Sequence, residues 1–173
     1  MVALAALYAG LVHASHRAQG VAAFNEVAPV FQSPRCMNCH RSDLPRVRED
    51  GRDHVPRVRP ASDGTGEGGE RCTICHRDNN NPISRIPGAP HWKMPPYEMS
   101  WDGLEAADIC ANLKDRRFNG DRSLAEVLAH VEKDAVIAWA WTPGSDRSTP
   151  PVPFDAFKER LARWISLGAP CAD

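Results

Sequence analysis

Two stretches of the chain place a pair of cysteines and a histidine at the same close spacing. They are Cys36-Met37-Asn38-Cys39-His40 and Cys72-Thr73-Ile74-Cys75-His76. Two thiols at this spacing can form thioether bonds to the two vinyl groups of one porphyrin, and the adjacent imidazole can then bind the iron. The spacing predicts two covalently attached c-type haems, with His40 and His76 as the proximal iron ligands.

A four-thiolate zinc site is the main alternative, because paired C-x-x-C motifs also bind zinc. Residues 40–71 separate the two pairs, a longer spacer than the roughly 15–20 residues typical of a zinc ribbon. A histidine follows both pairs, although the chain has only 7 histidines in 173 residues. Neither a zinc site nor a redox dithiol explains both the duplication and the histidines. Haem is therefore the preferred hypothesis.

The sixth ligand of each iron decides what the haems do, because an open position allows small-molecule binding or catalysis. His54 lies in a loop from which it can reach an iron, and His130 lies at the edge of the apolar stripe of a predicted helix. We predict these two histidines as the distal ligands, which gives bis-histidine ligation at both haems. Met99, just before a predicted helix, and His91, in a Pro-rich loop, are the alternates.

Residues 41–71 have no hydrophobic periodicity and are rich in Arg, Asp, Gly and Pro, which indicates a loop. Arginine is the natural partner of carboxylates, and each haem carries two propionates. We expect most of the arginines in this loop to be solvated and balanced by Asp43, Glu49, Asp50 and Asp53, with propionate binding by one or two of them as the alternative. The arginines concerned are Arg41, Arg46, Arg48, Arg52, Arg57 and Arg59.

Cys110 and Cys171 remain after the haem motifs are assigned. An even remainder predicts a disulfide in an oxidising compartment; two unrelated buried thiols are the alternative. Residues 1–12 form an apolar run that is too short to span a bilayer and resembles the core of a signal peptide, although no Lys or Arg precedes it. We predict a signal peptide or N-terminal anchor at 1–20, a di-haem domain at 21–173, and a periplasmic location.

The composition fits a mainly α protein, with helices and long loops wrapped around two haems and little or no strand. Apolar residues make up 42% of the chain, and the net charge of −1 suggests neither nucleic acid nor an anionic membrane surface as a partner. Hydrophobic periodicity predicts helices at 22–33, about 103–114, from Ser123 onward, and 154–167, with a strongly apolar segment at 134–141. Asp102 with Glu105, and Ser123 with Glu126, have the spacing of capping boxes.

Beyond the haem motifs, the chain resembles a family of bacterial exported di-haem proteins over about residues 30–172. The resemblance depends on Pro87-Gly88-Ala89-Pro90, Trp92, Met99-Ser100-Trp101, the stretches 113–120 and 130–144, and Gly168-Ala169-Pro170-Cys171. Members are often labelled isoquinoline 1-oxidoreductase subunits. The resemblance implies a molybdenum hydroxylase that passes electrons to this subunit, and it favours His130 over His91 as a ligand.

These features together predict an electron carrier without catalytic residues. The protein would pass electrons to or from a periplasmic redox protein or dehydrogenase. The alternative is a haem enzyme, peroxidase-like, in which one haem keeps an open site. Carbon monoxide binding to the reduced protein distinguishes the two, since a six-coordinate carrier has no free position.

Overall fold

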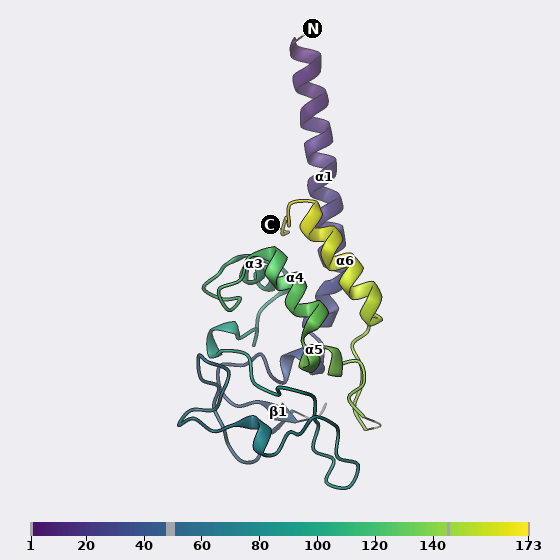
Figure 1. Ribbon diagram of the computed structural model, residues 1–173. Coiled ribbons are helices and arrows are strands. Elements are labelled where there is room, and N and C mark those ends of the chain that lie inside the picture. Colours follow the sequence, from purple (N-terminus) through teal and green to yellow (C-terminus); the bar gives the residue numbers. More distant parts are fainter. Residues whose placement is uncertain (1, 48–50, 145, 173) are drawn as a thin grey trace.

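The computed structural model describes residues 2–47, 51–144 and 146–172, with side chains described from residue 14 onward. The fold is mainly helical, as the sequence predicts (Figure 1). The only strands in the described part form one short antiparallel pair, in which Arg46 lies opposite Asp53. The elements are α1 (Val2–Phe31), α2 (Pro34–Met37), β1 (Arg46–Val47), β2 (Arg52–Asp53), α3 (Ala106–Lys114), α4 (Leu124–Lys133), α5 (Ala135–Trp139) and α6 (Phe154–Ser166).

Helix α1 is longer than the sequence predicts. The expected helix at 22–33 is the C-terminal part of a 30-residue helix that passes through position 20 without interruption. In Figure 1 its N-terminal half extends away from the rest of the chain, and its C-terminal half lies beside α6. Gly20 allows this approach, because a Cβ there would lie 2.4 Å from Cγ of Pro170. None of the described helices has the length and hydropathy needed to cross a membrane.

The main core fills the space between α1, α3, α4 and α6. Val27, Ile109, Leu161 and Trp164 are all buried there, which is the expected result of apolar residues recurring at helical spacing. Phe31, the last residue of α1, packs edge-on against Trp101 with ring centroids 5.4 Å apart. The core therefore fixes the end of α1, after which the first C-x-x-C-H motif begins at Cys36.

Only one of the two predicted capping boxes is correct. The Ser123 hydroxyl accepts from the backbone N–H of Glu126, and the Glu126 carboxylate accepts from the backbone N–H of Ser123, so α4 begins as predicted. Helix α3 begins later than predicted, with Glu105 as its N-cap and Asp108 completing the box. The reason is Gly103, whose φ of +72° makes a turn that a helix cannot include.

The segment from 41 to 105 is mostly loop and lies at the opposite end of the molecule from the N-terminus (Figure 1). It contains β1, β2 and two single-turn 3₁₀ helices, at Cys72–Ile74 and Tyr97–Met99. A second, smaller apolar cluster of Ala89, Trp92 and Trp139 joins this region to α5. For the described residues of 41–71, the expectation of a long loop is thus confirmed apart from the two short strands.

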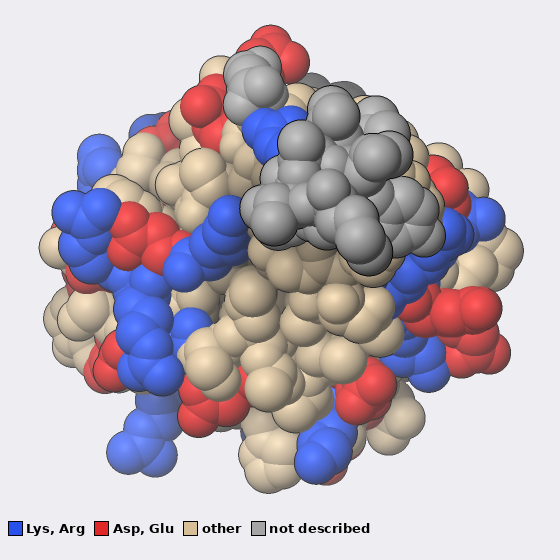
Figure 2. Space-filling view, turned by 90° about the horizontal axis from the view of Figure 1, so that it is seen from above, with Lys and Arg blue, Asp and Glu red and all other residues tan. Residues whose placement is uncertain are grey.

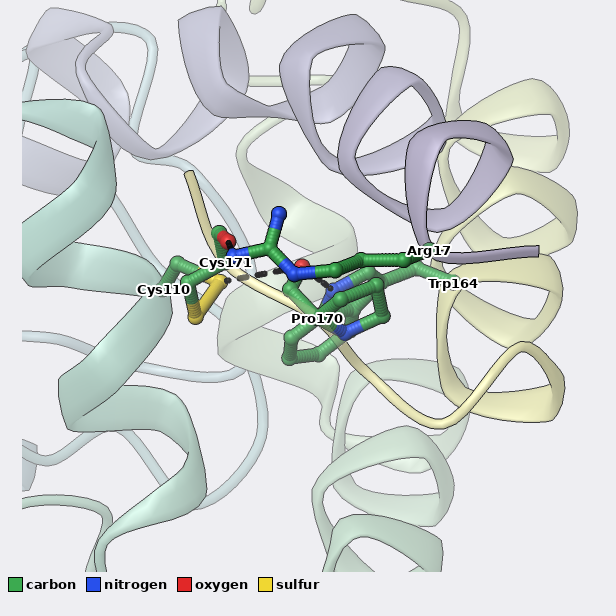
Figure 3. The surroundings of a disulfide bond; sticks show 5 residues. All are labelled: Arg17, Cys110, Trp164, Pro170 and Cys171. Atoms are coloured by element: carbon green, nitrogen blue, oxygen red, sulfur yellow. Dashed lines mark hydrogen bonds between the residues drawn. A yellow bond between two sulfur atoms is a disulfide. The ribbon is translucent and has the colours of Figure 1, made fainter. Parts of the chain in front are cut away.

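Cys110 and Cys171 form the disulfide that the cysteine count predicts (Figure 3). The bond links α3 to the end of the chain across a separation of 61 residues. Two further contacts hold the same segment: Trp164 Nε1 donates to the Pro170 carbonyl at 3.0 Å, and Arg17 Nη2 donates to the Cys171 carbonyl at 3.2 Å. The alternative of two unrelated thiols is therefore wrong.

Basic and acidic side chains alternate on the face seen along the axis of α1 (Figure 2). Blue and red residues are interspersed around neutral ones, and neither sign dominates this face. This distribution agrees with the net charge of −1 for the whole sequence.

Candidate haem-attachment sites

Each C-x-x-C-H motif lies beside its own cavity. The cavity at the first motif, which we name the first cavity, has a volume of about 580 Å³ and is lined by Cys36, Cys39 and His40. The cavity at the second motif, the second cavity, has a volume of about 440 Å³, and Cys72, Cys75 and His76 line it. Both volumes fall within the roughly 300–1,000 Å³ of cofactor and ligand sites.

His40 is fixed in the first cavity by two contacts with one short segment. Its Nδ1–H donates to the Met99 carbonyl at 2.9 Å, and its ring stacks on Trp101 with centroids 3.5 Å apart and planes 3° from parallel. With Nδ1 bound, Nε2 is the nitrogen that can bind a metal, and such a carbonyl partner is what orients metal-binding histidines. Burial lowers the pKa of His40 to about 4, which keeps its imidazole neutral at physiological pH.

A guanidinium bridge holds the His40 segment to the Trp101 segment. Arg41 donates through both terminal nitrogens to the Asp102 carboxylate at 2.7 and 3.0 Å, and through Nε to Asp43 at 2.8 Å. Hydrogen bonds from Arg41 hold the pKa of Asp43 well below its usual range. The residue directly after the first motif is therefore a fixed link between the motif and the Trp101 segment that packs under His40.

The two cysteines of the first motif are half-buried at the cavity wall. Helix α2 carries Cys36, and Pro34 at its first position starts a new turn after α1 has ended. Desolvation in the cavity wall raises the pKa of Cys36 to about 12 and that of Cys39 to about 11. Both thiols are therefore neutral at physiological pH, and both line the first cavity.

The second motif repeats the arrangement with different partners. Nδ1–H of His76 donates to the Pro87 carbonyl at 2.8 Å, and its ring stacks on Trp92 with centroids 4.5 Å apart and planes 5° from parallel. Burial is the main cause of a lowered pKa at His76. Gly88 follows the acceptor, and a Cβ there would lie 2.3 Å from the carbonyl oxygens of Arg77 and Asn79. Close backbone packing thus fixes the carbonyl that orients His76.

His54, the first predicted distal ligand, lies across the second cavity from His76. Its Nδ1–H donates to the Pro56 carbonyl at 2.8 Å, which again leaves Nε2 available. A metal–imidazole bond is about 2 Å long, so two imidazoles on opposite sides of one iron hold their bonding nitrogens about 4 Å apart. Their ring centres lie roughly 1 Å farther out and are then about 6 Å apart when both rings point at the iron. The observed centroid separation of His54 and His76 is 5.8 Å, with ring planes 32° from parallel, so the separation of the two rings is suited to ligands of one iron.

His130, the second predicted distal ligand, lines the first cavity together with His40. It projects from α4, and its Nδ1 lies 3.5 Å from the Asp134 carboxylate, which also caps α5. Burial lowers the pKa of His130, so a neutral imidazole with Nδ1 toward a carboxylate faces this cavity. The structure therefore brings one predicted distal histidine to each motif.

The alternates are less well placed than these two histidines. His91 is exposed and is not among the described residues that line either cavity. Met99 is buried and lines the first cavity, but its carbonyl binds Nδ1 of His40, so its backbone lies on the side of His40 away from Nε2. Met94 is buried and lines both cavities. Its position in the sequence, within a Pro-rich loop, gives no sign of this burial.

Arginines gather at both cavities, although only some belong to the 41–71 loop. Arg46 and Arg52 line the second cavity, and Arg46 also pairs with Asp43 and Asp53. Arg57 pairs with Asp53, Arg41 pairs with Asp43 and Asp102, and Arg59 is exposed and is not among the described residues that line either cavity. Arg48 lies outside the described residues. Other arginines at the cavities were not predicted: Arg35, Arg71, Arg85 and Arg147 line the second cavity, and Arg35, Arg116, Arg117 and Arg122 the first.

The described residues contain no group of three or more His, Cys, Asp or Glu arranged to hold a metal ion alone. Among the motif cysteines, Cys36 lines only the first cavity, Cys72 and Cys75 line only the second, and Cys39 lines both, so no one cavity is lined by all four. The arrangement of thiols therefore does not resemble the four-thiolate zinc site considered as the alternative.

The tryptophans under the two proximal histidines were not predicted from spacing alone. Trp92 lies 16 positions after His76, whereas Trp101 lies 61 positions after His40, so no common interval marks them. What they share is a place in loops rich in Pro and Met, where a large aromatic residue needs a partner to be buried.

No family model, curated protein or solved structure matches the chain. The functional interpretation consequently depends on the two motifs and the two cavities.

Proposed function

We propose that this protein is an exported di-haem c-type cytochrome that carries electrons and has no catalytic residues of its own. The observation that carries the proposal is the repeated arrangement at the two motifs. In both, two thiols and a histidine line a cavity, Nδ1 of the histidine is bound to a carbonyl, and a second histidine lines the same cavity.

The residues present fit the group that the motifs imply. Cys36 and Cys39 would hold one haem and Cys72 and Cys75 the other, with His40 and His76 as proximal ligands. His54 and His130 would supply the distal ligands. When bound, each haem iron supplies a site that takes up and releases one electron.

The protein's own groups set the conditions for that chemistry. Trp101 and Trp92 hold the proximal rings in place, and the carbonyls of Met99 and Pro87 leave Nε2 as the bonding nitrogen. Two imidazole ligands favour a lower reduction potential than a histidine and a methionine. The arginines at both cavities are suited to neutralise propionates.

The partner and compartment follow from the same hypothesis. The Cys110–Cys171 disulfide fits an oxidising compartment such as the periplasm, where c-type haem is also attached. We propose a periplasmic redox protein or dehydrogenase as the partner, with the molybdenum hydroxylase implied by the family resemblance as one form of it. Residues 1–20 remain predicted as a signal peptide, which would be removed, or as an N-terminal anchor, which would be retained.

The first test is haem content and ligation in the protein purified from a host that matures c-type cytochromes. Intact mass and a pyridine haemochrome spectrum should give two haems per chain, and the oxidised protein should lack the far-red band of a methionine–iron bond. A protein that matures without haem would contradict the proposal.

The second test assigns the distal ligands with matched variants. His54→Ala and His130→Ala should each create one carbon monoxide-binding haem in the reduced protein, and the double variant two. His91→Ala is the control, because that side chain is exposed and lines neither cavity within the described residues; it should bind none. Rapid stoichiometric binding to the unaltered protein would instead support the haem enzyme with one open site.

A further inference from the structure

The first and second cavities share part of their lining. Five described residues line both of them: Arg35, Cys39, Lys93, Met94 and Trp139. Cys39 belongs to the first motif and yet reaches the second cavity, so a side chain that would hold one haem borders the site of the other. The two sites are therefore neighbours that a single layer of side chains separates.

Trp139 is the largest member of this shared wall and the most firmly held. Its side chain is only 8% exposed, and its Nε1–H donates to Asn80 Oδ1 at 2.8 Å. Asn80 Oδ1 also accepts from the Gly88 N–H at 3.1 Å, and Asn80 Nδ2 donates to the Thr142 carbonyl at 3.2 Å. One amide thus ties the indole to the loop that carries the Pro87 acceptor of His76.

Aromatic contacts connect the same indole to the second proximal histidine. His76 stacks on Trp92 at 4.5 Å, and Trp92 meets Trp139 edge-to-face at 4.8 Å and 73°. The Arg35 guanidinium also lies over the Trp139 ring, 5.9 Å from its centre. Arg35 is itself 7% exposed and lies directly before Cys36. Trp139 therefore connects structural parts of both sites.

We propose that Trp139 is a positioning residue common to both haems, which bind as a neighbouring pair whose redox properties depend on each other. The inference rests on the proposed function, because it concerns the environment of the groups that the two motifs would hold. The Trp139 indole is held by its hydrogen bond to Asn80 and its contact with Trp92, so it would limit how closely a porphyrin in either cavity can approach the shared wall. Because the wall is common, the charge on one iron also acts on the other, and this coupling is reciprocal.

The first experiment uses the unaltered holoprotein, so it does not depend on the folding of a variant. Electron paramagnetic resonance of the fully oxidised protein should show magnetic interaction between the two ferric haems. Partial reduction should narrow the remaining signal as one partner becomes diamagnetic. Two signals that simply add, unchanged by reduction of the other haem, would overturn the inference.

The second experiment compares Trp139→Leu with Trp139→Phe and Trp141→Phe. Trp141 is the matched control, since it lines the first cavity but is not among the described residues of the second, and its Nε1–H donates to the Val152 carbonyl at 2.7 Å. Trp139→Leu should shift the resonance signals and midpoint potentials of both haems. Trp139→Phe should give smaller shifts of the same sign, and Trp141→Phe should change one haem at most.

Measuring the haem content distinguishes failure of the proposed function from failure of the proposed role of Trp139. If the unaltered protein carries no haem, the proposed function fails. If two haems are attached and Trp139→Leu moves the signals of only one of them or of neither, the proposed function stands and the shared role of Trp139 is refuted. A general loosening of the fold would not give smaller signal shifts for Trp139→Phe than for Trp139→Leu. It would also not confine the effect of Trp141→Phe to one haem.

Discussion

Removing the Cys110–Cys171 disulfide should destabilise the fold by about 4 kcal/mol. The two cysteines are 61 positions apart. In the chain-entropy model a closed loop of that length lowers the entropy of the unfolded chain by about 14 cal/mol/K, or about 4 kcal/mol at 25 °C. The stability of the native state should therefore fall by this amount when the cross-link is cut.

The clean perturbation is reduction of the unaltered holoprotein, because the haem thioethers resist thiol reagents and no side-chain volume is lost. The Cys110→Ala/Cys171→Ala double variant is the second route; it adds the cost of a small cavity, since Cys110 is fully buried. Urea unfolding followed by far-ultraviolet circular dichroism measures the difference. The m-value should rise, because an unfolded chain without the cross-link exposes more surface.

The visible spectrum of the double variant, compared with that of the unaltered protein at the same iron oxidation state, should stay unchanged, because neither cysteine is among the described residues lining either cavity. A loss below about 1 kcal/mol, with an unchanged m-value, would refute the loop-entropy reasoning. It would mean that the unfolded chain without the cross-link is already compact, so that the disulfide removes little of its entropy.

Three other changes test the sites. Gly88→Ala should lower the melting temperature and disturb the second haem only, because its Cβ would collide with two carbonyl oxygens; an unchanged spectrum and melting temperature would contradict this. Trp101→Ala should lower the free energy of unfolding in urea by about 3–5 kcal/mol, because a large buried ring is lost, and it should alter the spectrum of the first haem alone, because Trp101 stacks on His40. An unchanged spectrum of the first haem would show that this stacking is unimportant. The Asp43 carboxylate has a lowered pKa, so it stabilises the fold above the unfolded value of about 4, and this contribution disappears as the pH falls through the folded value. Asp43→Asn should therefore lose up to about 1 kcal/mol at pH 7, and its deficit in pH-dependent unfolding should close in acid; a constant deficit would oppose the assignment.

Local signals predicted the parts of this protein that depend on a few adjacent residues. The box of Ser123 and Glu126 starts α4 as expected, because both partners lie within one helical turn. The box expected at Asp102 is wrong because Gly103 turns the chain, and that turn follows the anchoring of Trp101 to the His40 segment. The contact between Trp101 and His40, which are far apart in sequence, therefore determined where the capping box of α3 could form.

The same distinction applies to the proposed haem sites. The proposed attachment depends on five consecutive residues, so a local motif predicts it twice, whereas the surroundings of each site do not follow from a local motif. The environment is built from distant segments: the shared wall takes Arg35 from α2, Cys39 from the first motif, Lys93 and Met94 from a Pro-rich loop, and Trp139 from α5.

The apolar run at 134–141 indicated burial of Trp139 but could not say whether it packs against other side chains or against a haem. The structure shows that it packs against Trp92 and also lines both cavities. A residue of this kind has no motif, because its role is set by two sites that approach each other only in the folded chain. Substitutions at such positions should leave both haems attached and change how they behave, and this is the difference that the Trp139 and Trp141 variants measure.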